Sequence, residues 1–400
     1  MGSAAKRFRP NMSPDEIIAA MNINNIGRTG KKPPEDGEKQ LIENFKLLLL
    51  ESTQRKKIFE QYLYLQDHPI THFDKKLKLD FDIQQIRFHV LNGDMEAAEQ
   101  IIKDVYLYED AFDDEQHYYY NKHLGNFHYA HGDYKKAFDH YAIAEKLVLD
   151  SFPQLELGDL YYSLGLTASQ FFETVKGLKY TEIALKIYQQ EFVPKRITEC
   201  HINLGVIHSR LRNFKTAIDH NHAALKIGQE LNSNLLRFST EYNYGYIYFQ
   251  FQNYQLAIEH ISKSLDHLPP EYVTDYLMSF NSLVKASNEL GDKEQALYWL
   301  DRGSEIANEI DSEEIIDRNV KEVYTEHKVL SFFLNNEIEQ YENLMLNVWL
   351  PLLEHKNHLF ELGYYYNQVG NYYLGKGEFE KAAHMLKKAS NTFQHLMTTG

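Results

Sequence analysis

The chain repeats one pattern of apolar and polar positions, and the pattern is clearest between residues 121 and 141. After the Gly-Asp pair at 132–133, apolar side chains recur every three or four residues, which is the spacing of one buried face of an α-helix. A second helical segment precedes the pair, so the stretch predicts two helices joined by a tight turn. Gly125 in the first helix and Ala137 in the second are small, and small residues let antiparallel helices approach closely.

The same spacing of small residues returns along the rest of the chain. Gly125, Gly165, Gly205 and Gly245 follow one another at intervals of 40 residues. A small residue twelve positions later recurs as well, in the pairs Gly205 with Ala217, Gly245 with Ala257, Val284 with Ala296, and Gly370 with Ala382. Helical units with a period of roughly 20–50 residues are typical of solenoids, whose units bury their apolar faces only by stacking.

The repeats predict an all-α fold. We expect a right-handed superhelical solenoid of about eight tetratricopeptide-like helix-turn-helix repeats, preceded by an N-terminal helical extension. The unit near residue 329 is the least regular. Residues 1–37 are expected to be a flexible leader with one short helix that starts at Ser13-Pro14, and residues 38–84 a helical segment that offers a surface to an effector. Residues 85–400 form the repeat domain.

The composition narrows the function classes. The formal net charge is −15 and the calculated pI is about 5.7, which argues against nucleic acid as the ligand of the solenoid because phosphate binding needs clustered cations. We find neither a DNA-binding helix-turn-helix, nor a secretory leader, nor an apolar run long enough to span a membrane. The single cysteine, Cys200, excludes an internal disulfide framework and is predicted to be a buried, inert thiol. A cytoplasmic protein is expected.

Three motifs resemble catalytic or metal-binding sites, but none of them predicts such a site. Residues 370–377 match most of a phosphate-binding loop but lack its final Ser or Thr and follow no strand. The histidine pairs 128/131 and 201/208 share helix faces, yet no carboxylate or cysteine completes a metal-binding set. The acidic cluster at 110–115 is predicted to cap a helix. We therefore predict no catalytic residue, no cofactor and no metal.

The stacking geometry indicates where a ligand would bind. In each repeat, side chains at about −6, −3, −2, +1, +4 and +5 from the glycine of the first helix are expected on the concave face of the superhelix. The candidate binding residues obtained in this way are Asn203, Asn243, Arg210, Tyr246, Gln250, Glu199, Tyr162, Asn281 and Lys285.

Asn203 and Asn243 occupy the same position in successive repeats. An asparagine side chain has one acceptor and two donors, so it pairs with both the C=O and the N–H of an extended peptide. The alternative is that each asparagine only satisfies neighbouring groups within the solenoid. Both interpretations are open at this point.

The sequence resembles a family of known receptors. The contexts Tyr-Asn-Tyr-Gly at Asn243 and Ile-Asn-Leu-Gly at Asn203, the repeat length near 40 residues, and the segment from Tyr118 through Leu147 are similar to the peptide receptors of Gram-positive quorum sensing, the Rap, NprR and PlcR (RRNPP) group. The pattern is nearest to the Rap-like proteins. The likeness covers residues 85–395 and is strongest at 116–310.

The resemblance implies a cytosolic regulator that binds a short, secreted and reimported oligopeptide in its concave groove. In that family, asparagines at the positions of Asn203 and Asn243 hold the peptide backbone. Rap members that read a basic peptide residue have an acidic side chain near the position of Arg210, so arginine here implies a peptide with an acidic residue or a carboxylate.

The output is open. Rap members act on response regulators through an N-terminal helical bundle, but the catalytic glutamine of that bundle has no clear match here, and no DNA-binding domain of the transcription-factor members is found in residues 1–84. A Rap-like phosphatase is one alternative. Another is a tetratricopeptide scaffold or co-chaperone that holds protein tails, with Arg210, Lys285, Asn203 and Asn243 supplying part of a carboxylate clamp. Homodimerisation is also open.

Overall fold

The computed structural model describes residues 37–51, 54–67, 75–171, 173–310, 318–356 and 358–399. The chain separates into two compact units, residues 1–163 and 164–400, and the boundary falls within helix α8. All regular secondary structure in the described ranges is helical, which confirms the predicted all-α class. The short helix predicted at the start of the leader lies outside the described residues.

The first unit begins with three helices that share an aromatic core. Its elements are α2 (Gly37–Glu51), α3 (Arg55–Gln66), α4 (Lys75–Leu91), α5 (Met95–Tyr106), the 3-10 turn η4 (Glu109–Ala111), α6 (Asp114–Ala130), α7 (Tyr134–Lys146) and the start of α8 (Gln154–Gln170). Phe45, Tyr62 and Phe88 join α2, α3 and α4, and the rings of Tyr62 and Phe88 stack at 3.9 Å. Helix α4 also packs on α5 and α6, so it belongs both to this bundle and to the first repeat, and it runs across residue 84.

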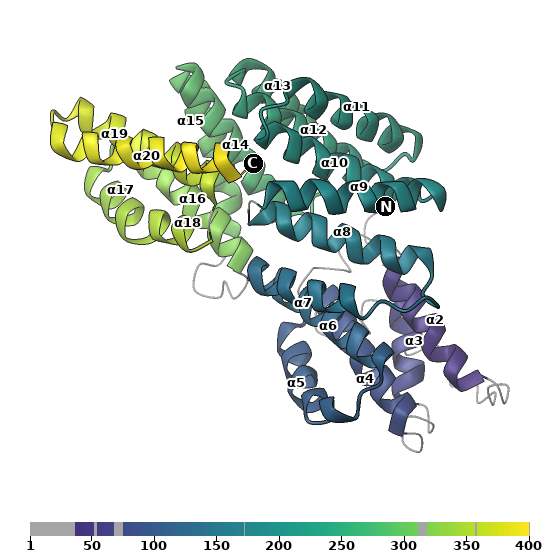
Figure 1. Cartoon of the computed structure of the whole chain (residues 1–400). Coiled ribbons are helices and arrows are strands. Elements are labelled where there is room, and N and C mark those ends of the chain that lie inside the picture. The colour runs from purple at the N-terminus through teal and green to yellow at the C-terminus, as the bar shows by residue number, and fades with distance from the viewer. Residues whose placement is uncertain are drawn as a thin grey trace. The chain divides into compact units, whose positions relative to one another are not determined.

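The second unit consists of antiparallel helix pairs stacked side by side (Figure 1). After α9 (Thr174–Gln190), its helices are α10 (Pro194–Arg210), α11 (Phe214–Glu230), α12 (Asn234–Gln250), α13 (Tyr254–Leu265), α14 (Val273–Leu290), α15 (Lys293–Glu309), α16 (Arg318–Leu334), α17 (Ile338–Leu344), α18 (Leu350–Lys356), α19 (Leu359–Gly375) and α20 (Phe379–Thr399). Counted from α4, the described residues form eight such pairs, as the sequence predicted.

The small residues of the repeat pattern lie where paired helices touch. A Cβ atom added at Gly205 would lie 3.3 Å from the carbonyl oxygen of Ala217, and one at Gly245 would lie 3.0 Å from that of Ala257. The predicted close approach is therefore confirmed in both repeats. At Gly125 the neighbour is the Tyr141 ring, 2.5 Å from the added Cβ, one helical turn beyond Ala137.

The turns inside the repeats share a left-handed residue. Gly93, Gly132, Gly291 and Gly377 have φ between 76° and 82°. The residue after the turn residue often caps the next helix: Asp292, for example, accepts a hydrogen bond from the backbone N–H of Gln295 at 2.9 Å. Asp113 caps α6 in the same way within the acidic cluster, which confirms the capping role predicted there.

The repeat that begins with α16 is irregular for a visible reason. Its second half is broken into α17, a π-helical turn η5 (Met345–Trp349) and α18. Pro351 follows the π turn and has no backbone N–H to donate to the preceding turn. The broken helix accounts for the weak repeat pattern near residue 329.

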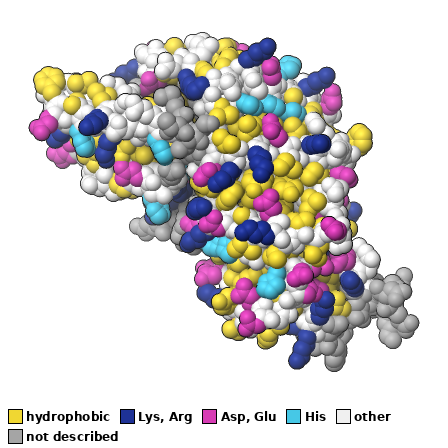
Figure 2. Space-filling model, viewed as in Figure 1, with side chains coloured by type: hydrophobic (Ala, Val, Ile, Leu, Met, Phe, Trp, Pro, Cys, Tyr) yellow, Lys and Arg dark blue, Asp and Glu magenta, His cyan; other side chains and the backbone are white. Residues whose placement is uncertain are grey.

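The charged surface and the single cysteine of the structure are as the composition of the chain predicts. Acidic and basic side chains are interspersed over the face shown in Figure 2. Cys200 is a free cysteine with 0% exposure, and burial raises the pKa of its thiol, so the prediction of a buried, inert cysteine is confirmed. None of the described helices combines the length and the apolar character needed to cross a membrane.

A histidine pair between α10 and α11 predicts acid sensitivity. The Nδ1 atoms of His201 and His220 are 2.9 Å apart, so one donates while the other accepts, and both rings cannot be protonated there at once. Burial and the charges of His201 and His208 lower the pKa of His220 to about 4. The folded state therefore binds fewer protons than the unfolded chain, and its stability is complete above about pH 6.5 and falls as the pH decreases towards 4.

We expect this loss to be about 1 kcal/mol, because the partly exposed ring is screened by solvent. Urea denaturation of the wild type and of His220→Gln, each at pH 7.5 and pH 5, measures it. The wild type should lose more stability than the variant over this interval. Equal losses would show that His220 does not carry the effect.

Candidate functional site

Eight of the nine candidate binding residues lie on three first helices of the second unit. Glu199, Asn203 and Arg210 are on α10; Asn243, Tyr246 and Gln250 are on α12; Asn281 and Lys285 are on α14. First helices of adjacent repeats contact one another directly, α10 with α12 and α14 with α16, and no comparably extensive contact joins the second helices. This arrangement places the first helices on the inner face of the stack. Tyr162 lies on α8, in the first unit.

The two asparagines are held within the solenoid through their amide nitrogens. The Asn203 Nδ2 donates to Thr181 Oγ1 at 2.8 Å, and this side chain is buried. The Asn243 Nδ2 donates to the carbonyl oxygen of Ser239, one turn earlier in its own helix, at 2.8 Å, and Asn243 is half-buried. These bonds fix the orientation of both side chains. They leave the Oδ1 of Asn243 without a partner in the described part of the chain.

Arg210 and Gln250 are anchored on neighbouring helices. The Arg210 guanidinium donates to the carbonyl oxygen of Ser169 and, at 3.1 Å, to its hydroxyl. Gln250 accepts a hydrogen bond from the Ser209 hydroxyl at 3.2 Å, while its buried Nε2 has no partner among the described residues. Glu199 pairs with Arg196 on its own helix at 3.0 Å.

Asn281 and Lys285 belong to a polar network centred on Glu326. The Lys285 Nζ is 2.7 Å from Glu326 Oε1, which also accepts a hydrogen bond from the Tyr365 hydroxyl at 2.7 Å. Asn281 has 0% exposure, donates to the carbonyl oxygen of Val323 at 2.9 Å and pairs with His327 at 3.0 Å. The network therefore neutralises the lysine and places Asn281 beneath the surface.

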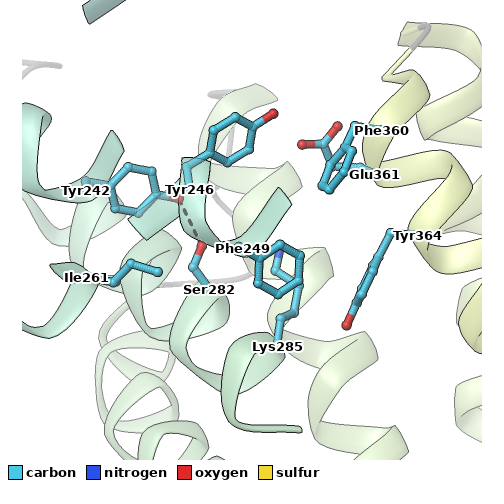
Figure 3. A pocket seen from close by; sticks show the side chains of 9 residues that line it. All are labelled: Tyr242, Tyr246, Phe249, Ile261, Ser282, Lys285, Phe360, Glu361 and Tyr364. Carbon is cyan, nitrogen blue, oxygen red and sulfur yellow. Dashed lines mark hydrogen bonds between the residues drawn. The ribbon is translucent and has the colours of Figure 1, made fainter. Parts of the chain in front are cut away.

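An aromatic pocket opens between α12, α14 and α19 (Figure 3). It is lined by Tyr242, Tyr246, Phe249, Ile261, Ser282, Lys285, Phe360, Glu361 and Tyr364. The open depression measures about 410 Å³, and the space inside it that is free for water-sized groups is about 30 Å³, enough for about two water molecules.

The polar groups of the pocket hold its rings in place. The Tyr242 hydroxyl and the Ser282 hydroxyl are hydrogen-bonded at 2.9 Å, as the dashed line in Figure 3 shows. Burial and the Glu361 carboxylate, opposed by Arg210, raise the pKa of Tyr246 to about 12. The ring therefore carries a neutral hydroxyl at physiological pH.

Sequence analysis missed the α19 side of the pocket. Tyr364 stands six positions before Gly370, so the offsets applied to the earlier glycines would have selected it had they been applied to the last repeat. Phe360 and Glu361 stand one turn earlier and match none of those offsets. Only the fold brings them opposite Tyr246.

Within the described ranges, no group of three or more His, Cys, Asp or Glu side chains could hold a metal ion.

Comparisons with known proteins show which proteins share the sequence or the fold of this chain. No protein-family model matches the sequence. A stretch of 110 residues is 34% identical to the transcriptional activator NprA of Geobacillus stearothermophilus, and it covers 27% of this chain and 27% of NprA. The chain thus matches about a quarter of the length of that curated relative.

Solved structures of Rap and NprR proteins resemble nearly the whole chain. A Rap protein complexed with the Competence and Sporulation Factor gives a TM-score of 0.76 at 14% identity, covering 92% of this chain and 100% of that protein. NprR in complex with its cognate peptide NprX gives a TM-score of 0.68 at 18% identity, covering 89% of this chain and 99% of NprR. The resemblance to the Rap and NprR group is therefore confirmed at the level of the fold.

Proposed function

We propose that the chain is an intracellular receptor for a short signalling oligopeptide. The peptide binds on the first helices of residues 164–400 and thereby regulates a downstream protein or transcriptional output. One observation carries the proposal: the fold matches, over about 90% of the chain, two proteins that were solved with a signalling factor or peptide bound. The partial similarity to a transcriptional activator supports a regulatory role.

The first helices offer what an extended peptide needs. The free Oδ1 of Asn243 would accept a peptide N–H, and the unpartnered Nε2 of Gln250 would donate to a peptide C=O after a small movement. Aromatic side chains of the adjoining pocket supply apolar contact area at low entropic cost, because each ring has few rotatable bonds. Backbone pairing with side-chain pockets is a general way to bind short peptides.

The carboxylate-clamp alternative is less well supported by the geometry. A clamp for protein C-termini needs free cations that converge in one groove. Lys285 is already paired with Glu326, and Arg210 is bonded to Ser169. We propose that the effector surface lies on the helical segment 38–84, which contributes most of the aromatic core shared by α2, α3 and α4.

Native mass spectrometry of the protein purified from its natural host tests the receptor function. We expect a short peptide to remain bound to the wild type and to be lost from the Asn203→Ala/Asn243→Ala double variant. Each substitution removes one hydrogen-bonding side chain from the peptide backbone, so each should cost about 1 kcal/mol of binding free energy.

Asn213→Ala is the matched control. Asn213 lies in an exposed turn and its side chain makes no capping hydrogen bond, so this variant should retain the peptide. Circular dichroism verifies that the double variant, which also loses the bond to Thr181, is folded. A wild type that carries an intact protein partner and no peptide would overturn the proposal in favour of a scaffold.

A further inference from the structure

The aromatic pocket lies beside an unmatched negative charge. Glu361 is the one acidic side chain among the described lining residues, and it has no ion-pair partner in the part of the chain that the structure describes. Its carboxylate points towards the hydroxyl of Tyr246 (Figure 3). A carboxylate at the edge of a largely apolar pocket attracts a cation more strongly than the same group in water, because the local dielectric constant is lower.

The positive charge that lines the pocket is already neutralised. Lys285 is ion-paired with Glu326, and the two side chains are only 15% and 11% exposed. A further carboxylate, Glu289, lies next to the far end of the pocket, where its charge acts on the Tyr364 hydroxyl. Arg210 opposes Glu361 at the Tyr246 hydroxyl. The carboxylates of Glu361, Glu326 and Glu289 therefore face the two cations Lys285 and Arg210, an excess of one negative charge.

The rings of the pocket add to its preference for a cation. Tyr246 and Phe360 lie with centroids 6.1 Å apart and Phe249 and Tyr364 with centroids 5.6 Å apart, in edge-to-face pairs. In an edge-to-face pair, the ring that contributes its edge keeps both of its faces clear of its partner, and a cation within about 6 Å of a ring face is attracted by the negative π cloud. Rings from α12 and α19 therefore line the same space as the Glu361 carboxylate.

The free volume of the pocket suits a small cation. About 30 Å³ accommodates a group the size of one or two water molecules. A primary ammonium is of that size and fits the free space next to the Glu361 carboxylate. An ammonium also has three donors, which suit one carboxylate and neighbouring tyrosine hydroxyls.

We infer that this pocket takes a primary ammonium group of the bound peptide, either a lysine side chain or the free N-terminus. The inference rests on the proposed receptor function and adds a chemical requirement for the ligand. An ammonium at Glu361 does not exclude an acidic group of the peptide at Arg210. The charges of Arg210 and Glu361 both act on the Tyr246 hydroxyl, with opposite signs, so a cationic and an anionic group of one peptide could each find a partner there. A peptide with a cation and an anion would satisfy both.

Affinity selection from a random hexapeptide library, read by mass spectrometry, tests the inference. The wild type and Glu361→Gln are each exposed to the library with free amino termini and to the same library after N-acetylation. Glu380→Gln is the control, because Glu380 is an exposed carboxylate on the neighbouring helix α20. The best binder is resynthesised with lysine replaced by norleucine, or with its N-terminus acetylated, to identify the source of the ammonium.

We expect removal of the ammonium to weaken binding to the wild type and to Glu380→Gln about tenfold, and to have little effect on Glu361→Gln. Capture of hexapeptides without any dependence on an amine, or a dependence that persists in Glu361→Gln, would overturn the inference and leave the receptor function standing. A wild type that captures no hexapeptide would overturn the receptor function, and the inference would fall with it.

Discussion

Replacement of Lys122 by methionine is expected to destabilise the first unit by about 3–5 kcal/mol. Lys122 is 3% exposed and lies between two buried carboxylates, Glu156 and Asp159, with its Nζ 3.0 Å from Asp159 Oδ2. Burial lowers the pKa of Lys122, but the two carboxylates outweigh it and raise the pKa overall, so the lysine is charged. Methionine fills the same space and leaves two negative charges uncompensated.

Hydrogen–deuterium exchange of the α6 amides measures this loss locally, which is necessary because the two compact units need not unfold together. The deficit should shrink as the pH falls, since buried carboxylates without a cation take up protons at a higher pH than exposed ones. The triple variant Lys122→Met/Glu156→Gln/Asp159→Asn should recover part of the stability.

Lys135→Met is the control for the loss of a lysine as such. Lys135 pairs with Asp139 on the surface of α7 at 3.0 Å, with side chains 69% and 57% exposed, and such pairs contribute less than about 1 kcal/mol. If Lys122→Met behaves like Lys135→Met, the buried cluster does not hold the first unit together.

The repeat architecture could be predicted because its signals are local. A helix face repeats within four residues, and the glycine and the small residue twelve positions later mark the contact between two consecutive helices. The sequence therefore predicted the contact between Gly205 and Ala217. The sequence indicated the broken helix after α16 only as a loss of the repeat pattern, because one proline and one π turn leave no periodic signal.

The site could be predicted only on the helices whose repeats are regular. Tyr246 and Lys285 line the aromatic pocket as the offsets indicated, but their partners come from α19, far along the chain. The ion-pair network of Lys122 has no local signature either, because its carboxylates stand on another helix. Arg210 shows the same limit. Its type suggested a ligand contact, whereas in the structure it also donates to the backbone of Ser169 on α8.

A substitution at one of the repeat glycines is expected to cause the second large loss of stability. Gly245→Ala is expected to destabilise α12 and α13 by about 2 kcal/mol, because the new Cβ would overlap Ile261 Cγ1 and lie 3.0 Å from the carbonyl oxygen of Ala257. The better helix propensity of alanine offsets only about 1 kcal/mol of the strain. Since α12 also carries Tyr246 and Phe249, the same displacement should weaken peptide capture.

Gly375→Ala is the matched control, and its sign should be opposite. Gly375 is the last residue of α19, and an added Cβ would meet nothing within 4 Å, so alanine should stabilise this helix by up to about 1 kcal/mol. Hydrogen–deuterium exchange of α12 and α13 in the first variant, and of α19 in the second, separates the two effects. Unchanged protection of α12 in Gly245→Ala would mean that the helices move apart freely, and the close approach at the glycine would then not determine the position of the pocket.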